Sequence, residues 1–191
     1  MNGGSEVKKI GSKIRQARKA RRLRLKDVAK RVGCSESLLS KLEHDRVTPS
    51  LNMLHRIVTA LDTSIGALFT DPSHGDVQIY RKNNRPVIII DANDCGKPIR
   101  LERLVPHSED TMIDGNIHII EHGAWNGGEI KHKGQEVGYV IEGELTLAVG
   151  EKTYVLTAGD SFFFRSDLPH SYRNLSNTVT RVIWINTPPT F

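Results

Sequence analysis

Two histidines and one glutamate in the second half of the chain have the types and spacing of a metal or ligand site. His132 precedes Glu136 in the stretch IKHKGQEVGYVIEGELTL, and His170 follows in AGDSFFFRSDLPHSYRN. Neutral imidazoles and a carboxylate can supply a two-histidine, one-carboxylate set for one divalent metal ion. Spacing alone does not bring the three side chains together. Two surface histidines and a solvated glutamate remain the alternative.

The same three residues can also bind a small molecule without a metal. Glu136 beside His132 and His170 can hold an amine, an amino acid or another small polar metabolite through charge-assisted hydrogen bonds. Tyr172 lies on the same strand face as His170 and can line this effector site. Four other aromatic side chains are expected to belong to the core: Trp125, Phe162, Phe164 and Trp184.

A second chemical pattern lies near the start of the chain, where residues 33–49 read GCSESLLSKLEHDRVTP, the second half of a helix-turn-helix. If Ser35 caps a helix there, one polar face carries Ser37, Ser40, Lys41 and His44. At the start of this helix Glu36 can accept from cytosine N4, and Lys41 can donate to guanine O6 or N7, with Ser37 and Ser40 also in reach of base edges. Phosphate contacts are expected from Arg15, Arg18, Arg46 and Ser50.

The charge distribution supports a nucleic-acid partner for this half. Through Thr70 the chain has 15 Lys and Arg against 6 Asp and Glu, a formal charge of +9, and the remainder has 12 against 16, or −4. A compact domain with such an excess attracts phosphate, whereas an acidic domain adds nothing to that attraction. The alternative is a bundle that binds a protein, as an antitoxin-like module would. Steep salt dependence would distinguish DNA binding from it.

Apolar residues between residues 10 and 69 recur at helical spacing and predict about five short helices. Gly33 can take the positive φ that ends one helix, Ser35 can cap the next, and Pro49 with Ser50 opens the fourth. Arg24 is a poor cap for the second helix. The turn-forming segment TDPSHGD predicts a linker at 70–76.

After the linker the apolar period changes to two, which predicts an all-β domain. The expected strands are separated by Gly, Pro, Asn or Asp and cover Val87 to Ile90, Leu101 to Val105, Ile117 to Ile120, Val137 to Ile141, Leu145 to Val149, Tyr154 to Leu156, Ser161 to Phe164 and Val179 to Ile185. Many short strands with tight turns favour a sandwich or barrel that can hold a ligand. The predicted domains are therefore 1–69, helical, and 77–191, all-β, joined by 70–76.

The helical segment resembles the five-helix DNA-binding domain of phage-repressor-like (XRE family) regulators. The resemblance rests on LKDVAKRVGCSESLLSKLEHDRVTPSLNMLHRIVTALDTSIGALF, with Ala29 against the recognition helix, Gly33 at the turn, and Ser40, Glu43 and Pro49 at family positions. Asp45 stands where many members have Gly, so the end of that helix is expected to turn less tightly. Leu25 stands where some phage repressors have a DNA-contacting Gln.

The two stretches of the β domain resemble the paired motifs of the cupin superfamily, a double-stranded β-helix or jelly-roll barrel. This resemblance implies that His132, Glu136 and His170 point into the barrel. Ile130 occupies the place of the first histidine in the cupin HxH pair, on the same strand face as His132, so an apolar group stands where a ligand would be. With three of four ligands, a divalent metal is a possible cofactor rather than the favoured one.

Together these features predict a sequence-specific DNA-binding transcriptional regulator, expected to be a repressor, modulated by an effector in the barrel. The effector site comprises His132, Glu136, His170, Tyr172 and Ile130, and the effector is expected to be an amine or amino acid. A single reading helix contacts few bases, so a homodimer on a two-fold operator is expected. The alternative is a metal-dependent cupin enzyme or metal sensor with an accessory helix-turn-helix. We expect a regulator and no enzyme.

The chain is also expected to be cytoplasmic. Cys34 and Cys95 are its two cysteines and fall in different predicted domains, which does not fit a disulfide framework. The start, MNGGSEVKKIGSK, has no apolar stretch of signal-peptide length, and the aliphatic run from Val87 to Ile90 is too short to span a bilayer, so no membrane partner is expected.

Overall fold

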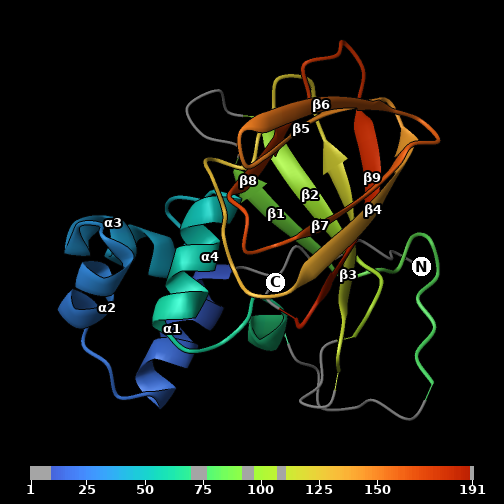
Figure 1. Cartoon of the computed structure of the whole chain (residues 1–191). Coiled ribbons are helices and arrows are strands. Elements are labelled where there is room, and N and C mark those ends of the chain that lie inside the picture. Colours follow the sequence, from blue (N-terminus) through green and yellow to red (C-terminus); the bar gives the residue numbers. More distant parts are fainter. Residues whose placement is uncertain (1–9, 70–76, 92–96, 107–110, 190–191) are drawn as a thin grey trace.

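The computed structural model describes residues 10–69, 77–91, 97–106 and 111–189. The predicted linker at 70–76 lies outside these residues, and so does Cys95. Figure 1 shows a helical domain beside a β domain built from two sheets. In the described part of the chain no helix is both long enough and apolar enough to cross a lipid bilayer.

Within residues 10–69 the helical domain has four α-helices, so the expectation of five is wrong. The α-helices are α1 (Ile10–Ala20), α2 (Leu25–Val32), α3 (Glu36–Glu43) and α4 (Leu51–Ala60). After α4 the chain forms only a short 3₁₀ helix, η1 (Gly66–Phe69). Ser64 accepts a hydrogen bond from the amide of Ala67 at its start, and the i to i+3 bonding of such short segments is typical of 3₁₀ helices.

The predicted punctuation of the helix-turn-helix is confirmed. Gly33 has φ 70° and ψ 42°, and its amide donates to carbonyls at the end of α2. Ser35 then accepts from the amide of Leu38 at 3.1 Å and starts α3, and Ser50 caps α4 through Met53 at 3.2 Å. Arg24 makes no side-chain cap, as expected. These caps satisfy amide groups that each helix start would otherwise leave unpaired.

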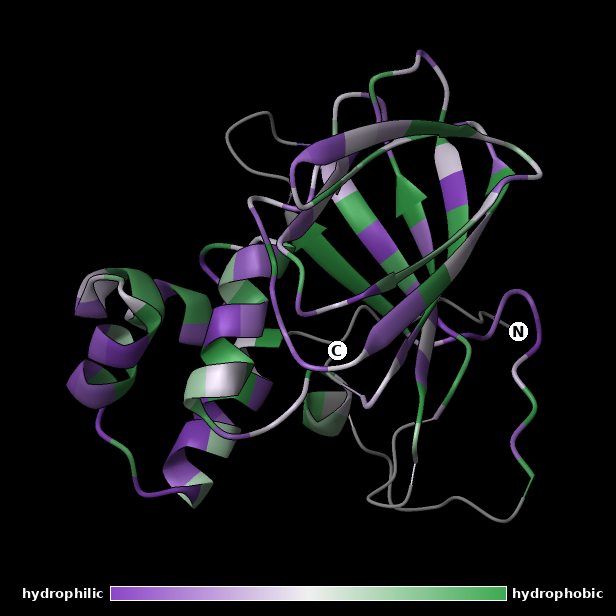
Figure 2. Cartoon of the chain, viewed as in Figure 1, coloured by the Kyte–Doolittle hydropathy of each residue, from purple (hydrophilic) through white to green (hydrophobic). Residues whose placement is uncertain are grey.

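The helical spacing of apolar residues builds one core, which fixes the outward face of α3. Leu39 and Leu42 are buried beneath α3, and Ala29 of α2 packs near them with 2% of its surface exposed. Other fully buried members of this core are Ile14, Val28, Val32, Leu54, Ile57 and Leu61. Figure 2 shows the resulting division of each helix into an apolar and a polar side.

The β domain contains nine strands in the described residues, where eight were expected. They are β1 (Val87–Asp91), β2 (Pro98–Arg103), β3 (Asp114–Ile120), β4 (Gln135–Glu142), β5 (Glu144–Val149), β6 (Lys152–Thr157), β7 (Ser161–Arg165), β8 (His170–Arg173) and β9 (Thr180–Thr187). β8 was not among the expected strands because its sequence, HSYR, has no apolar run. The strands form a six-stranded sheet, β1-β2-β3-β9-β4-β7, and a three-stranded sheet, β6-β5-β8.

The pairing of β4 with β7 and β9 places a glycine at a crowded point of the interior. Gly138 is the register partner of Phe162 on one side and of Trp184 on the other. A Cβ atom at Gly138 would lie 2.1 Å from Cζ of Phe162, so the aromatic ring occupies the space that any side chain would need. The missing side chain lets two large aromatic groups meet beside Glu136, whose side chain lies on the same face two residues away.

The two domains contact each other through α4 and the segment 126–132. The backbone amide of Asn52, in the first turn of α4, donates to the carbonyl of Asn126 at 3.1 Å. Its side-chain Nδ2 donates to the carbonyl of Glu129 at 2.5 Å. The helix that packs against α2 inside the helical domain therefore also holds a loop of the β domain.

Candidate functional site

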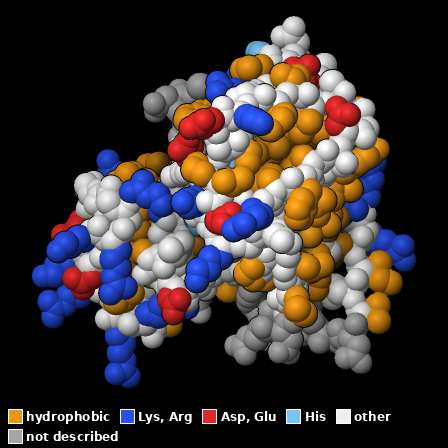
Figure 3. Space-filling view, in the orientation of Figure 1, with side chains coloured by type: hydrophobic (Ala, Val, Ile, Leu, Met, Phe, Trp, Pro, Cys, Tyr) orange, Lys and Arg blue, Asp and Glu red, His pale blue; other side chains and the backbone are white. Residues whose placement is uncertain are grey.

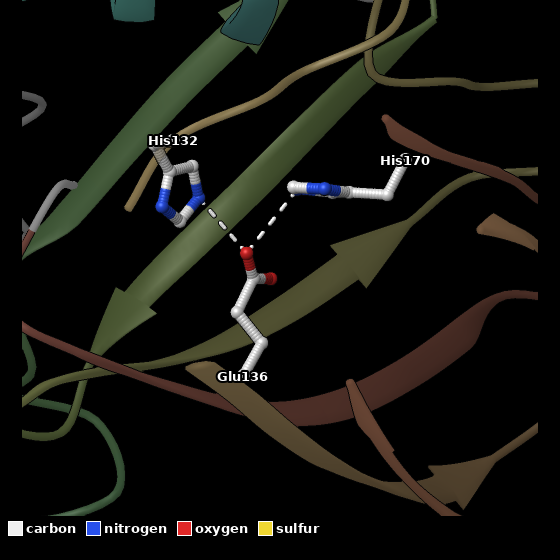
Figure 4. Close-up of side chains that lie close together, drawn as sticks. All are labelled: His132, Glu136 and His170. Atoms are coloured by element: carbon white, nitrogen blue, oxygen red, sulfur yellow. Dashed lines mark ion pairs between the residues drawn. The ribbon is translucent and has the colours of Figure 1, made fainter. Parts of the chain in front are cut away.

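Glu136 lies at the centre of the site, on β4, and its side chain has no exposed surface. Its Oε1 lies 2.8 Å from Nε2 of His132 and 3.2 Å from Nε2 of His170. Figure 4 shows both imidazoles pointing at this oxygen from separate segments of the barrel. The structure therefore brings together the three residues singled out in the sequence, and their three ligand atoms lie within 4.8 Å of one another.

Backbone carbonyls fix the orientation of both imidazoles. Nδ1 of His170 contacts the carbonyl of Leu168 at 2.9 Å, and Nδ1 of His132 contacts the carbonyl of Lys133 at 3.1 Å. A carbonyl oxygen can only accept, so each Nδ1 carries a hydrogen and each Nε2 faces Glu136. Histidines that bind metals are held in the same way.

The electrostatics of the triad favour positive charge at its centre. Burial alone would raise the pKa of Glu136, but the contacts with His132 and His170 outweigh it and the pKa is lowered. Burial also acts to lower the pKa of His170, yet the contact with Glu136 prevails and raises it. Glu136 is thus ionised and attracts either a proton on His170 or another cation. Metal binding would compete with that proton.

The donor set of the triad is one that divalent metals accept. It offers two imidazole nitrogens and one carboxylate oxygen, and these three atoms lie within 4.8 Å of one another. Neither Oε1 of Glu136 nor Nε2 of His170 has a hydrogen-bond partner of standard geometry within the described chain. The residues present therefore fit a divalent metal.

Aromatic rings enclose Glu136, and one of them contacts it directly. Nε1 of Trp184 donates to Oε2 of Glu136 at 2.5 Å, a role that the sequence did not reveal because the pairing of β9 with β4 was unknown. His118 stacks on Trp184 with ring centroids 5.0 Å apart, and its Nδ1 contacts the hydroxyl of Tyr172 at 2.9 Å. Trp184 is therefore more than a core residue. Trp125 is not a core residue, since it is 37% exposed.

Two further predicted members of the effector site, Ile130 and Tyr172, are buried near the triad. The backbones of Ile130 and His170 pair through two hydrogen bonds of 2.8 and 2.9 Å. Residues directly opposite in an antiparallel pair project from the same face, so Ile130 stands beside His170 as expected from the cupin pattern. Tyr172, 3% exposed, follows on β8.

The outward face of α3 carries the side chains expected to read DNA. Glu36, Ser37, Lys41 and His44 are exposed and Ser40 is half-buried. Nδ1 of His44 contacts the carbonyl of Ser40 at 2.8 Å, and its Nε2 lies 3.4 Å from Nη1 of the exposed Arg15. Arg46 is exposed and Ser50 is half-buried at the start of α4. Figure 3 shows Lys and Arg side chains spread over the helical domain.

Arg18, expected to contact phosphate, forms hydrogen bonds within the helical domain. Its Nε and Nη2 donate to the two carboxylate oxygens of Glu43 at 2.6 and 2.8 Å, and Nη1 donates to the carbonyl of Leu23 at 2.9 Å. Glu43 is 4% exposed. Burial acts against the charged guanidinium, but the hydrogen bonds to Glu43 prevail and raise the pKa of Arg18. The pair therefore joins α1 to α3.

The end of α3 is tightly turned despite the aspartate at position 45. Asp45 has φ 54°, the left-handed conformation that glycine adopts more easily. Its Oδ1 accepts from the amide of Gly11 at 2.7 Å, in the first turn of α1. A carboxylate at a helix N-terminus is stabilising, which offsets the strain of the turn. The expectation of a looser helix end is therefore wrong.

Comparison with known proteins agrees with both halves of this structure. A helix-turn-helix domain model matches residues 9–69, and a cupin domain model matches residues 116–186. The HTH-type transcriptional regulator PuuR of Escherichia coli (strain K12) is 26% identical over 185 residues, which cover 95% of this chain and 96% of that protein. The crystal structure of an HTH_3 family transcriptional regulator from Vibrio cholerae shares the fold with a TM-score of 0.69, at 22% identity, and covers 95% of this chain and 96% of its own.

One similar protein is an enzyme. The (S)-2-hydroxypropylphosphonic acid epoxidase of Streptomyces wedmorensis is 30% identical over 145 residues, which cover 68% of this chain and 69% of the enzyme.

Fold and sequence together define a two-domain protein with a helix-turn-helix and a cupin barrel. The chain belongs to the family of phage-repressor-like helix-turn-helix transcriptional regulators with a C-terminal cupin domain.

Proposed function

We propose that this regulator binds a two-fold operator and that occupancy of the His132, Glu136 and His170 site changes its operator affinity. The observation that carries the proposal is the buried, ionised Glu136 with two imidazole nitrogens aimed at it. A buried carboxylate in this setting has a large free-energy incentive to bind a cation. The proposed domain boundaries are 1–69 and 77–191, with 70–76 as linker.

The triad is best suited to a divalent metal ion held by two nitrogens and one oxygen. Such an ion, bound by three protein ligands, would offer open coordination positions to a small molecule. The same residues provide what a metal sensor needs: fixed imidazoles, an ionised carboxylate and an indole hydrogen bond that orients it.

A cationic amine or amino acid is the second candidate for the effector. The observation that favours it is the aromatic surround of Glu136, formed by Trp184, Tyr172, Phe162 and Phe164. Aromatic faces attract ammonium groups, and a buried carboxylate completes their recognition. This candidate requires His132 or His170 to move away from Glu136 to make space for an ammonium group.

One experiment compares these candidates. A duplex is selected from a random library with the purified protein, and its affinity is measured after chelation, with added Zn²⁺, and with a panel of primary amines and amino acids. A change of about 5-fold or more with Zn²⁺ that disappears in His170→Ala supports the metal. A change with an amine after chelation supports the second candidate. No change in any arm contradicts the proposed regulation.

A function without catalysis fits the relatives that match over nearly the full chain, since PuuR is a regulator. The similarity to an epoxidase keeps a concrete enzymatic alternative: a metal-dependent cupin reaction. Metal-loaded protein that turns over a small-molecule substrate in many cycles, without change in DNA affinity, would favour the enzyme.

We also propose a homodimer formed through the outer face of β4 and β7. Val137, Tyr139 and Ile141 alternate with buried residues along β4, and Phe163 lies opposite Val137 on β7. These four side chains are 42% to 65% exposed, and Figure 3 shows hydrophobic side chains gathered on this side of the β domain. A second copy would bury them and present two reading helices. Light scattering should show a dimer that Phe163→Glu dissociates.

A further inference from the structure

Helix α4 and the segment 126–132 form a joint between the two domains at the edge of the triad. The ring of His55, on α4, lies 5.2 Å from the ring of His132 between centroids, with the planes tilted by 34°. One turn earlier, Asn52 holds the carbonyls of Asn126 and Glu129. His132 thus contacts Glu136 on one side and the DNA-binding domain on the other.

The segment is equally well fixed to the β domain. Asn126 is fully buried, and its Oδ1 accepts from the amide of Tyr172 at 3.0 Å while its Nδ2 donates to the carbonyl of Gly128 at 2.8 Å. The amide of His132 donates to the carbonyl of Ser166 at 2.9 Å. Because the backbone of this segment is held at both ends, a change at the triad should move mainly the side chain of His132.

Helix α4 is also joined to α2, the helix that precedes the turn. The guanidinium of Arg56 donates to the carbonyl of Val32, the last residue of α2. Nη1 of Arg31 donates to the carbonyl of Ala60 at the end of α4, at 3.3 Å. Gly33 follows Val32 directly and sets the direction of α3. A displacement of α4 should therefore change the orientation of α3.

We infer that His55 couples the ligand site to the DNA-binding domain: its ring packs on His132 and transmits the position of that imidazole to α4. The inference rests on the proposed function and adds the route by which the site acts. His55 is a positioning residue, since its ring packs on the ligand-site residue His132. Two discrete positions of one packed side chain are enough to bias the orientation of a helix.

The contact between His55 and His132 is a packing of two rings, with centroids 5.2 Å apart and planes tilted by 34°. An uncharged ring of similar size should therefore replace His55. Residues on the adjoining surface of α4 include Thr59, one turn later, exposed and hydrogen-bonded to the carbonyl of His55 at 2.8 Å.

The test uses the full-length protein, the selected duplex and Zn²⁺ as the probe. Zn²⁺ affinity is measured by titration calorimetry, and duplex affinity is measured with and without Zn²⁺ for wild type, His55→Ala, His55→Phe and Thr59→Ala. His55→Ala should bind Zn²⁺ and the Zn²⁺-free duplex within about 3-fold of wild type, yet its response to Zn²⁺ should fall below about 2-fold. His55→Phe and the control Thr59→Ala should keep the response.

The outcomes separate this inference from the proposed function. If wild type binds Zn²⁺ at the triad but its duplex affinity does not change, the proposed regulation fails and the inference falls with it. If wild type responds and His55→Ala responds equally, only the coupling role of His55 is overturned. Loss of the response in His55→Phe as well as in His55→Ala would overturn packing as the means of coupling. Circular dichroism confirms that each variant is folded.

Discussion

Trp184 and Glu136 are joined by a hydrogen bond of 2.5 Å from the indole Nε1 to the carboxylate Oε2. Both residues are buried, and they lie on adjacent strands of the six-stranded sheet. The bond leaves Oε1 as the oxygen that faces His132 and His170. One carboxylate oxygen is thus fixed by the scaffold and the other is presented to the site.

Replacing Trp184 should therefore weaken cation binding without removing any ligand atom. In Trp184→Phe the carboxylate keeps an aromatic neighbour but loses its orienting donor. We expect Zn²⁺ affinity to fall about 10- to 100-fold, the usual effect of removing such a hydrogen bond. Titration calorimetry measures it, and Trp125→Phe, at an exposed tryptophan, serves as the control. Equal affinity in wild type and Trp184→Phe would contradict an orienting role.

Ile130→His should strengthen metal binding. The side chain of residue 130 projects from the same face as His170, so a histidine there adds a fourth ligand, and a third nitrogen, to the existing set. We expect Zn²⁺ to bind at least about 10-fold more tightly, as measured by competition with a chelating dye. Ile130→Val tests the effect of side-chain size alone. A loss of affinity in Ile130→His would mean that the fourth position is not accessible from residue 130.

Lys41→Ala should reduce operator affinity by about 1–3 kcal/mol and relax the preference at one base pair. Lys41 is exposed on the outward face of α3, the helix that we propose enters the major groove. Arg46→Ala, at a proposed phosphate contact, should instead weaken operator and random duplex alike. Binding to a set of single-base operator variants separates the two. Equal losses on every duplex would assign Lys41 to phosphate.

Arg18→Met should destabilise the helical domain by about 3 kcal/mol, because it leaves the buried carboxylate of Glu43 without its partner. Urea unfolding followed by circular dichroism measures this loss. The double variant Arg18→Met with Glu43→Gln removes the uncompensated charge and should recover much of it. No recovery would show that the guanidinium acts through its bond to Leu23.

Acid should destabilise the β domain through His118. Burial lowers the pKa of His118 to about 3, so the folded state resists a proton that the unfolded state accepts near pH 6.5. Stability is therefore highest above pH 6.5 and falls as the pH decreases toward 3, by up to about 1.4 kcal/mol per pH unit from this group. His118→Asn should flatten the profile of unfolding free energy against pH. An unchanged slope would exclude His118 as the cause.

The sequence predicted the helix boundaries well because local chemistry sets them. Gly33, Ser35 and Ser50 act within one turn of the chain, so their types alone define where helices end and begin. Contacts between residues far apart in the sequence could not be predicted in this way. The turn at Asp45 is stabilised by Gly11, which is 34 residues away. Likewise, only the fold brings Glu43 to the guanidinium of Arg18.

The triad was predictable from the family pattern, whereas its surroundings were not. His132, Glu136 and His170 belong to two motifs with recognisable spacing. Trp184 and His118 depend on which strands pair, and a period of two says nothing about the partner of a strand. His55 belongs to another domain altogether, and no pattern within either domain places it beside His132.

The two hydrogen bonds from Asn52 to the carbonyls of Asn126 and Glu129 have a practical consequence for building hybrid regulators. Exchanging the first 69 residues for those of another repressor would replace Asn52 and so remove these hydrogen bonds, even though the exchange point is not at the interface. A chimera should keep a folded helical domain and a folded barrel but lose its response to the effector, unless asparagine and histidine are restored at positions 52 and 55. Transplanting one domain therefore requires transplanting the residues that contact the other.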